Sequence, residues 1–358
     1  MNLPSPAPAG SHIFGSASPV RPAPERVPRI ALIDLARGLA LGAMVVFHTA
    51  WDLSFLGFLQ SDISADPDWR LFSHLIAGSF LCLSGISLGL AHGRGLLPDP
   101  FRDRVVIIVG AALLVTLGTW VALSDRLVMF GILHSIAFGT ILCRPLLRRS
   151  WWLPVLLAIP VGLLPSVAES PLLSGLQGWI AASPFFVLWQ HTGLSVLPPM
   201  TVDFVPIFPW FAIMLVGLAG GLRMARGTGA SRLATFPAPG VLAPLVWAGR
   251  RSLPIYLIHQ PVLIGGLMLV SHAMPGLTTG LALRAEDTFR RDCVQECRSA
   301  NTMEVCMRSC GCVIEKLRED PARFKSIVIE GRNDKAATDG INAAVIMCFR
   351  PPKGAGGG

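Results

Sequence analysis

Charged residues are scarce in this chain of 358 residues, of which Asp, Glu, Lys and Arg together make up 15%. Soluble domains carry about 25% charged residues, so the shortage argues against a soluble globular protein. Hydrophobic residues make up 52% of the chain, and its mean hydropathy is +0.57. Together with repeated apolar runs near the length of a bilayer span, about 20 residues, this composition indicates an integral membrane protein.

The signature motifs of several enzyme classes are missing as well. No GxSxG, HExxH, P-loop or GxGxxG context occurs, so the sequence gives no support to hydrolase, protease or nucleotide chemistry. No apolar segment with a small-residue cleavage site precedes Arg29, which argues against a signal peptide. Residues 1–29 are rich in Pro, Ala and Ser and are predicted to be a disordered cytoplasmic tail. The first hydrophobic run is expected to be an uncleaved signal-anchor.

The apolar runs predict an all-α fold, a polytopic transmembrane helix bundle of about seven spans. The connections between them alternate between Arg-rich and Arg-poor, and residues 167–205 contain no Lys or Arg. By the positive-inside rule, this asymmetry places the N-terminus in the cytoplasm and the end of the last span outside. The predicted spans lie near residues 30–50, 71–92, 105–123, 127–143, 151–166, 206–223 and 252–273.

Two shorter apolar segments do not fit this pattern of spans. Gly175–Gln190 is broken by Pro184 and is predicted to be re-entrant or interfacial, and Leu242–Gly249 is too short to span. The net charge of +8 does not indicate a nucleic-acid partner, because the Arg residues cluster between apolar runs, where the positive-inside rule places them.

The composition changes after about residue 284, and residues 284–358 hold six of the eight cysteines. Cys293 and Cys297, and likewise Cys306 and Cys310, are spaced i, i+4, so each pair lies on one helix face. Two such helices could be joined by disulfides, for example Cys293–Cys310 and Cys297–Cys306, in the oxidising compartment that the topology predicts. Sequence alone leaves the pairing open. A zinc site is the alternative, although the spacing is unusual for zinc and the segment has no His.

Ionisable side chains in or beside a membrane span indicate function, because they are costly to place there. His48 follows a stretch without polar side chains from Leu39 to Phe47, and Asp52 comes one helical turn later. An imidazole with a carboxylate at i, i+4 suits the deprotonation of an amine or hydroxyl that attacks an acyl donor. The predicted catalytic residues are His48, Asp52 and His134, the last about two turns into the fourth span.

A second set of polar and ionisable residues lies toward the predicted cytoplasmic end of the spans. Arg37 and Arg250 are predicted to attract the phosphates of a CoA thioester, because a guanidinium group suits bidentate phosphate contacts. Ser252 and, deeper in the span, His259 complete the predicted cofactor-binding set. Asp34 lies three residues before Arg37, so a structural ion pair between these two is the alternative.

Three residues at the predicted outer face, Asp203, Trp210 and His74, are expected to contact a polar substrate. The first two belong to the loop VDFVPIFPWF (Val202–Phe211), whose acid, prolines and aromatics indicate a rigid rim. The alternative for this loop is a helix N-terminus with proline caps. For His74 the alternative is a hydrogen bond between helices.

Five short motifs follow one another along the chain: IDLARGLALGAMVVFH (Ile33–His48), FLCLSGISL (Phe80–Leu88), FGILHSIAF (Phe130–Phe138), DFVPIFPWF (Asp203–Phe211) and GRRSLPIYLIHQP (Gly249–Pro261). In this order they resemble the catalytic-domain family of heparan-alpha-glucosaminide N-acetyltransferases, in its bacterial branch. The resemblance covers about residues 29–272 and implies a multi-span enzyme that passes an acetyl group from cytoplasmic acetyl-CoA to a sugar amine across the membrane.

The chain departs from the pattern of this family in two places. In the animal members an Asn occupies the place of His48, and their extracytoplasmic catalytic His has no clear partner in loop 51–70 here. The Cys-rich tail is not part of the resemblance.

The sequence therefore predicts a membrane acetyltransferase with a transmembrane domain at 30–275 and a Cys-rich, disulfide-bonded domain at 284–358. Acetyl-CoA is the expected co-substrate, and the bacterial inner membrane is the expected location. The expected partners are membrane lipid and a sugar or glycan acceptor; a homo-oligomer is left open, and neither nucleic acid nor a metal is expected. The alternatives are an O-acetylase of surface polysaccharide, a proton-coupled transporter of small solutes or lipid, and a scaffold that presents the Cys-rich domain.

Overall fold

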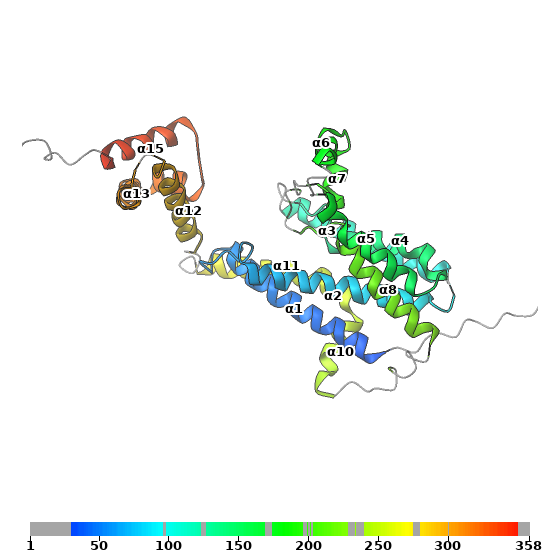
Figure 1. The fold of residues 1–358 in the computed structure, drawn as a ribbon. Coiled ribbons are helices and arrows are strands. Elements are labelled where there is room, and N and C mark those ends of the chain that lie inside the picture. The colour runs from blue at the N-terminus through cyan, green and yellow to red at the C-terminus, as the bar shows by residue number, and fades with distance from the viewer. Residues whose placement is uncertain are drawn as a thin grey trace, which may run out of the picture.

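Helices make up all the named elements of the computed structural model (Figure 1). The structure describes residues 30–95, 98–122, 127–168, 174–195, 203–227, 240–274, 280–299 and 301–349, with the single positions 199, 201 and 233. The predicted tail at 1–29 lies outside the described residues. The chain forms a long bundle from α1 to α11 and, beyond one end of it, a separate group of helices from α12 to α15 (Figure 1).

Four of the described helices are long and apolar enough to cross a membrane. They have 22 to 26 residues, or roughly 33–39 Å at 1.5 Å per residue, which exceeds the bilayer core of about 30 Å. Large apolar side chains on α3 are more than half exposed, as expected of a surface that faces lipid. The four helices are α1 (Ala31–Phe55), α2 (Pro67–His92), α3 (Pro98–Ala122) and α11 (Ser252–Ala273).

The other three predicted spans are helical but shorter, so the number seven remains a prediction. They are α4 (Ile132–Cys143), α5 (Trp152–Ala168) and α8 (Trp210–Arg226). Between α5 and α8, two short helices, α6 (Ser174–Ala182) and α7 (Phe186–Thr192), occupy most of the segment predicted to be re-entrant or interfacial.

The predicted start of the fourth span at residue 127 is wrong. Phe130 forms an isolated parallel bridge with Phe204, and the backbone N–H of Val205 donates to the Phe130 carbonyl at 3.1 Å. This pairing holds the chain extended up to Gly131, so α4 begins at Ile132. His134 therefore lies in the first turn of its helix rather than two turns into it.

Helices α2 and α8 are held together by glycines on both sides of their contact. A methyl group at Gly85 would lie 2.2 Å from the Met214 carbonyl oxygen, and one at Gly217 would lie 2.2 Å from that of Cys82. Small residues let membrane helices approach backbone to backbone, where dispersion drives association. The main core is completed by buried side chains of the same two helices, Leu81, Leu88, Leu215, Leu218 and Leu222.

The short helix α10 (Ala243–Arg250) folds back along the first turns of α1. A methyl group at Gly249 would lie 1.7 Å from the Asp34 carbonyl oxygen, and one at Gly38 would lie 2.0 Å from that of Leu245. Because α10 occupies this part of α1, the next helix, α11, packs alongside the middle of α1. Leu41 and Met44 there form one cluster with Ile255 and Tyr256.

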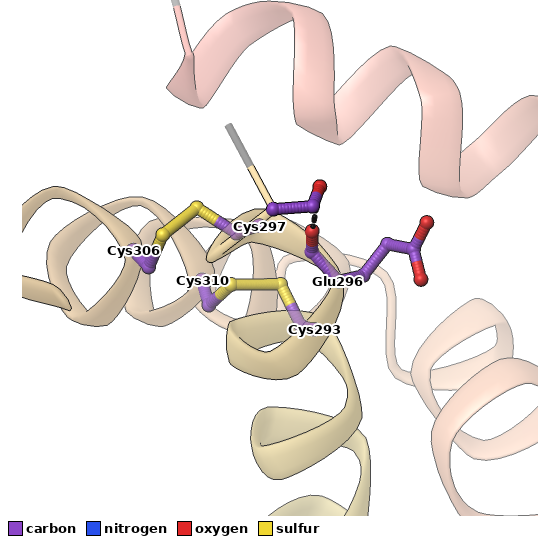
Figure 2. Close-up of a disulfide and its surroundings, with 6 residues drawn as sticks. Cys293, Glu296, Cys297, Cys306 and Cys310 are labelled. Atoms are coloured by element: carbon purple, nitrogen blue, oxygen red, sulfur yellow. Dashed lines mark hydrogen bonds between the residues drawn. A yellow bond between two sulfur atoms is a disulfide. The ribbon is translucent and has the colours of Figure 1, made fainter. Parts of the chain in front are cut away.

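The Cys-rich segment forms a helical domain with its own small core. The predicted pairs Cys293–Cys310 and Cys297–Cys306 are confirmed as disulfides between two helices (Figure 2). A third disulfide, Cys312–Cys348, was not predicted. The zinc alternative is wrong, because each of these six sulfur atoms takes part in a disulfide bond. The elements of the domain are α12 (Gly280–Cys297), α13 (Met303–Arg318), α14 (Pro321–Phe324), the π-helix η6 (Lys325–Ile329) and α15 (Lys335–Cys348).

The first turns of α12 contact the chain at the end of α1. The Gly280 N–H donates to the Gly57 carbonyl at 2.8 Å, and Arg284 donates to the Ser54 hydroxyl at 2.9 Å and to the Ser54 carbonyl. Ser54 is buried and lies two residues beyond Asp52. The Cys-rich domain is thus attached directly to the end of the first span.

Peptide mapping without reduction is expected to recover three cross-linked pairs from this domain. Alkylation of the denatured, unreduced protein is then expected to label Cys82 and Cys143 alone, because they have no sulfur partner. Replacing Cys312 and Cys348 together by Ser is expected to lower the stability of the domain by about 2–5 kcal/mol. Recovery of Cys293 or Cys306 as a free thiol in the native protein would contradict the assignment.

Candidate active site

Four polar side chains from two spanning helices meet in an apolar surrounding. His48 and Asp52 come from α1, and His259 and Gln260 come from α11. The ring centroids of the two histidines are 5.0 Å apart, and the Gln260 Nε2 donates to Asp52 Oδ1 at 2.7 Å. We call these four residues the histidine cluster.

Each member of the histidine cluster has a buried polar atom that makes no hydrogen bond to any residue that the structure describes. These atoms are His48 Nδ1, Asp52 Oδ2, His259 Nε2 and Gln260 Oε1. An unsatisfied buried polar atom costs about 1–3 kcal/mol, and most buried polar groups in proteins are satisfied. Such atoms on two paired helices suit a site for a polar ligand, because a hydroxyl or an amine could donate hydrogen bonds to them.

The tautomer of His259 follows from its neighbour. Its Nδ1 lies 2.5 Å from the Tyr256 carbonyl oxygen, which can only accept a hydrogen bond. Nδ1 therefore carries the proton, and in the neutral ring Nε2 presents a lone pair to the histidine cluster. His259 is thus oriented to accept a hydrogen bond or a proton.

The predicted pairing of His48 with Asp52 is not what the structure shows. Asp52 is fully buried and accepts its hydrogen bond from Gln260, while His48 Nδ1 bonds to no protein atom. One helical turn separates the two residues, but the Asp52 carboxylate is directed across to α11. Asp52 can therefore orient Gln260, and the neighbour of the His48 ring is His259.

His259 is predicted from the sequence to lie deeper in its span than Arg250 and Ser252, and the structure places its ring beside that of His48. Ser252 is the first residue of α11. Since α10 folds back along the start of α1, α11 begins beside the middle of α1, and its eighth residue reaches His48.

Arg250 is bound to the other end of α1. Its Nε lies 3.2 Å from Asp34 Oδ2, and its side chain remains about half exposed. The sequence offers an ion pair between Asp34 and Arg37 as an alternative. In the structure, Asp34 pairs with Arg250, and Arg37 donates to Ser87 on α2. This basic end is separated from His48 by fourteen residues of α1, or roughly 21 Å.

His134 lies outside the histidine cluster. Thr116 gives its single hydroxyl proton to the Val128 carbonyl at 2.7 Å, so it accepts from His134 Nε2 at 3.1 Å. The ring also lines a shallow cavity of about 210 Å³ between α3 and α4, with Phe130 and Phe138. Its link to the cluster runs through apolar packing, because Leu133 shares a small core with Tyr256.

The three predicted substrate residues are only partly brought together. The exposed His74 ring lies edge-to-face on Trp210 with centroids 5.3 Å apart. Asp203 instead accepts from the Ile132 N–H at 3.2 Å and so caps α4. Burial raises the pKa of this carboxyl, and the hydrogen bond from Ile132 opposes the rise. Gly131 makes room for Asp203, because a methyl group there would lie 2.2 Å from Oδ2.

Two residues of the site were not singled out from the sequence. Gln260 directly follows His259 within the motif Gly249–Pro261, so the signal was present there. Tyr256 is the one tyrosine of the chain, and it holds the tautomer of His259 through its backbone carbonyl.

Comparison with protein families gives a match over much of the chain. The family described as "Heparan-alpha-glucosaminide N-acetyltransferase, catalytic" matches residues 29–261, which is more than half of the chain. Neither the curated proteins nor the solved structures give a significant match. The matched segment contains the whole histidine cluster and ends before the Cys-rich domain.

Proposed function

Because the chain belongs to the heparan-alpha-glucosaminide N-acetyltransferase catalytic family, we propose that this membrane acetyltransferase uses cytoplasmic acetyl-CoA and acetylates an amine or hydroxyl of a cell-envelope sugar. The observation that carries the proposal is the histidine cluster, with its four unused hydrogen-bonding atoms. A base beside hydrogen-bonding partners is what the attack of a nucleophile on a thioester needs.

In the proposed reaction, the acceptor nitrogen or oxygen attacks the thioester carbonyl of acetyl-CoA. His48 takes the proton that the acceptor loses, the new C–N or C–O bond forms, and the C–S bond breaks. The CoA thiolate leaves and is protonated, so one acetylated acceptor and one CoA thiol result. Direct transfer is the simpler route, and an acetyl-histidine intermediate is the alternative.

The remaining members of the cluster would position the acceptor. His259 presents its Nε2 lone pair and would accept a hydrogen bond from the acceptor. Asp52 holds the amide of Gln260, whose Oε1 would accept a second one. Such positioning matters because a misplaced nucleophile loses much of the benefit of being bound.

The donor would lie along α1, with its phosphates at the basic end and its thioester near His48. Arg250 has half of its side chain exposed there, and its charge is held in place by Asp34. This arrangement agrees with a cytoplasmic N-terminus, which the Arg-rich connections predict. His74 and Trp210 would contact the sugar beyond the opposite end.

The purified full-length protein is expected to release CoA thiol from acetyl-CoA only when a suitable acceptor is present. Thiol release is to be measured across a panel of amino sugars and their N-acetylated counterparts, which lack the amine. Release with the amine alone would identify an N-acetyltransferase, and release with both would identify an O-acetylase. If the protein binds acetyl-CoA but releases no CoA thiol with any of these acceptors, the result would count against the proposal.

A further inference from the structure

Two arginines from different helices converge on one face of α2. Arg37 of α1 donates from Nη2 to the Ser87 hydroxyl. Arg104 of α3 donates from Nη2 to the hydroxyl of Ser84 at 3.0 Å and to its carbonyl at 3.2 Å. Ser84 and Ser87 are three residues apart, so they lie on the same face of the helix. One turn of α2 thus receives two guanidinium groups.

The two guanidinium groups carry the same charge and donate to serines one helical turn apart, so they repel each other. A guanidinium group does not lose its proton in a protein, so the repulsion persists at every working pH. Among the described residues, no ion pair joins Arg104 to a carboxylate. The Arg104 Nε is also buried and makes no hydrogen bond within the described part of the chain. Like charges in a low-dielectric interior are costly unless an opposite charge offsets them.

Arg102 lies two residues earlier on α3 and provides a comparison. Its placement is that of an arginine at the exposed end of a span. Its side chain is 71% exposed, and it lies within 4 Å of Asp99 and Asp103. Arg104 has the opposite surroundings: its polar head is turned into the bundle, next to α2, and one of its donors is unused. Orientation of the helix in the membrane does not require this burial.

We propose that Arg37 and Arg104, together with Ser84 and Ser87, form a phosphate-binding site that takes the diphosphate of the acyl donor. This inference rests on the proposed function and extends the donor site from Arg250 to α2 and α3. A guanidinium fork binds phosphate oxygens bidentately, and two forks match the two charges of a diphosphate. The unused Arg104 Nε supplies a donor for one of its oxygens, and the Ser84 hydroxyl can supply another. The Ser87 hydroxyl gives its proton to the Leu83 carbonyl and holds Arg37 in place.

The test measures binding of CoA and of inorganic pyrophosphate to the purified full-length protein by isothermal titration. Arg104→Gln is expected to weaken both by about 10- to 100-fold, since hydrogen bonds to charged groups are worth about 1.5–3 kcal/mol each. Arg104→Lys keeps the charge but loses the fork, so it is expected to lie between Arg104→Gln and the parent. Arg102→Gln is the matched control and is expected to bind like the parent.

The outcomes separate this inference from the proposed function. If Arg104→Gln binds CoA and pyrophosphate like the parent, the phosphate site is wrong and the acetyltransferase proposal is untouched. If the parent binds pyrophosphate through Arg104 but does not bind CoA, the phosphate site holds and the donor assignment fails. If vesicles containing phosphatidylglycerol bind through Arg104 and CoA does not, the phosphate belongs to a lipid. If Arg104→Gln does not fold, Arg104→Lys carries the test.

Discussion

Replacing His48 by Gln is expected to lower turnover by about 10²–10⁴-fold, which is the usual contribution of a positioned general base. Glutamine keeps a hydrogen-bonding side chain beside His259 but cannot take a proton. Acetyl-CoA binding is expected to stay near the parent value, because the basic end of α1 lies roughly 21 Å away. Single-turnover rates and donor affinity, measured separately, would distinguish the loss of chemistry from the loss of binding.

The pH profile adds a second criterion. In the parent protein, activity is expected to fall on acidification, because a protonated imidazole cannot accept the proton of the acceptor. The residual activity of His48→Gln is expected to lose this dependence. His272→Gln is the control, since His272 is exposed in the last turn of α11, away from the cluster.

A near-parent rate and an unchanged pH profile in His48→Gln would make His48 structural. His259→Gln then becomes the decisive variant, because His259 Nε2 is the other lone pair in the cluster. If His259→Gln loses the rate and the pH dependence instead, the roles of the two histidines are exchanged. Asp52→Asn is expected to lose less than either, since Asp52 acts through Gln260.

Replacing Gly221 by Ala is expected to destabilise the bundle by about 1–3 kcal/mol, the usual cost of overpacking. The added methyl group would lie 2.2 Å from the Ile86 carbonyl oxygen, and backbone cannot move aside as a side chain can. The helices α2 and α8 would have to separate, and they form the main core. The unfolding midpoint of the purified protein in detergent would report the loss.

The neighbouring residue provides the control for this prediction. Gly220 has nothing within 4 Å of the position that a methyl group would take. Gly220→Ala is therefore expected to leave stability unchanged or to raise it by up to about 1 kcal/mol, because alanine favours helix more than glycine does. Equal effects of the two substitutions would mean that the close contact of α2 and α8 does not limit stability.

Long apolar runs allowed α1, α2, α3 and α11 to be predicted from the sequence, because length and composition are properties of a single segment. The start of α4 could not be predicted, since it depends on a bridge between Phe130 and Phe204, far apart in the chain. The contact of His259 with His48 could not be predicted for the same reason. The depth of His259 is set by α10 folding back along α1, and hydropathy carries no information on that contact.

The cysteines of the C-terminal domain give the same lesson on a smaller scale. The i, i+4 spacing placed Cys293 and Cys297 on one face and Cys306 and Cys310 on another, so a simple hairpin made the observed pairing one of the possibilities. Cys348 is 36 residues from its partner Cys312, and their pairing depends on where α15 returns. Local periodicity cannot specify such a return.

The attachment of Arg284 to Ser54 makes this end of α1 depend on the redox state of the Cys-rich domain. The helix α12 that carries Arg284 is held to α13 by two disulfides, so a strong reductant would weaken the fold that keeps Arg284 in place. Ser54 lies two residues after Asp52, within the same helix as His48. A proteolytic cut after Ala273 would have a similar effect. It would leave the four candidate spans of the described residues intact but would remove the contact of Arg284 with Ser54, two residues after Asp52.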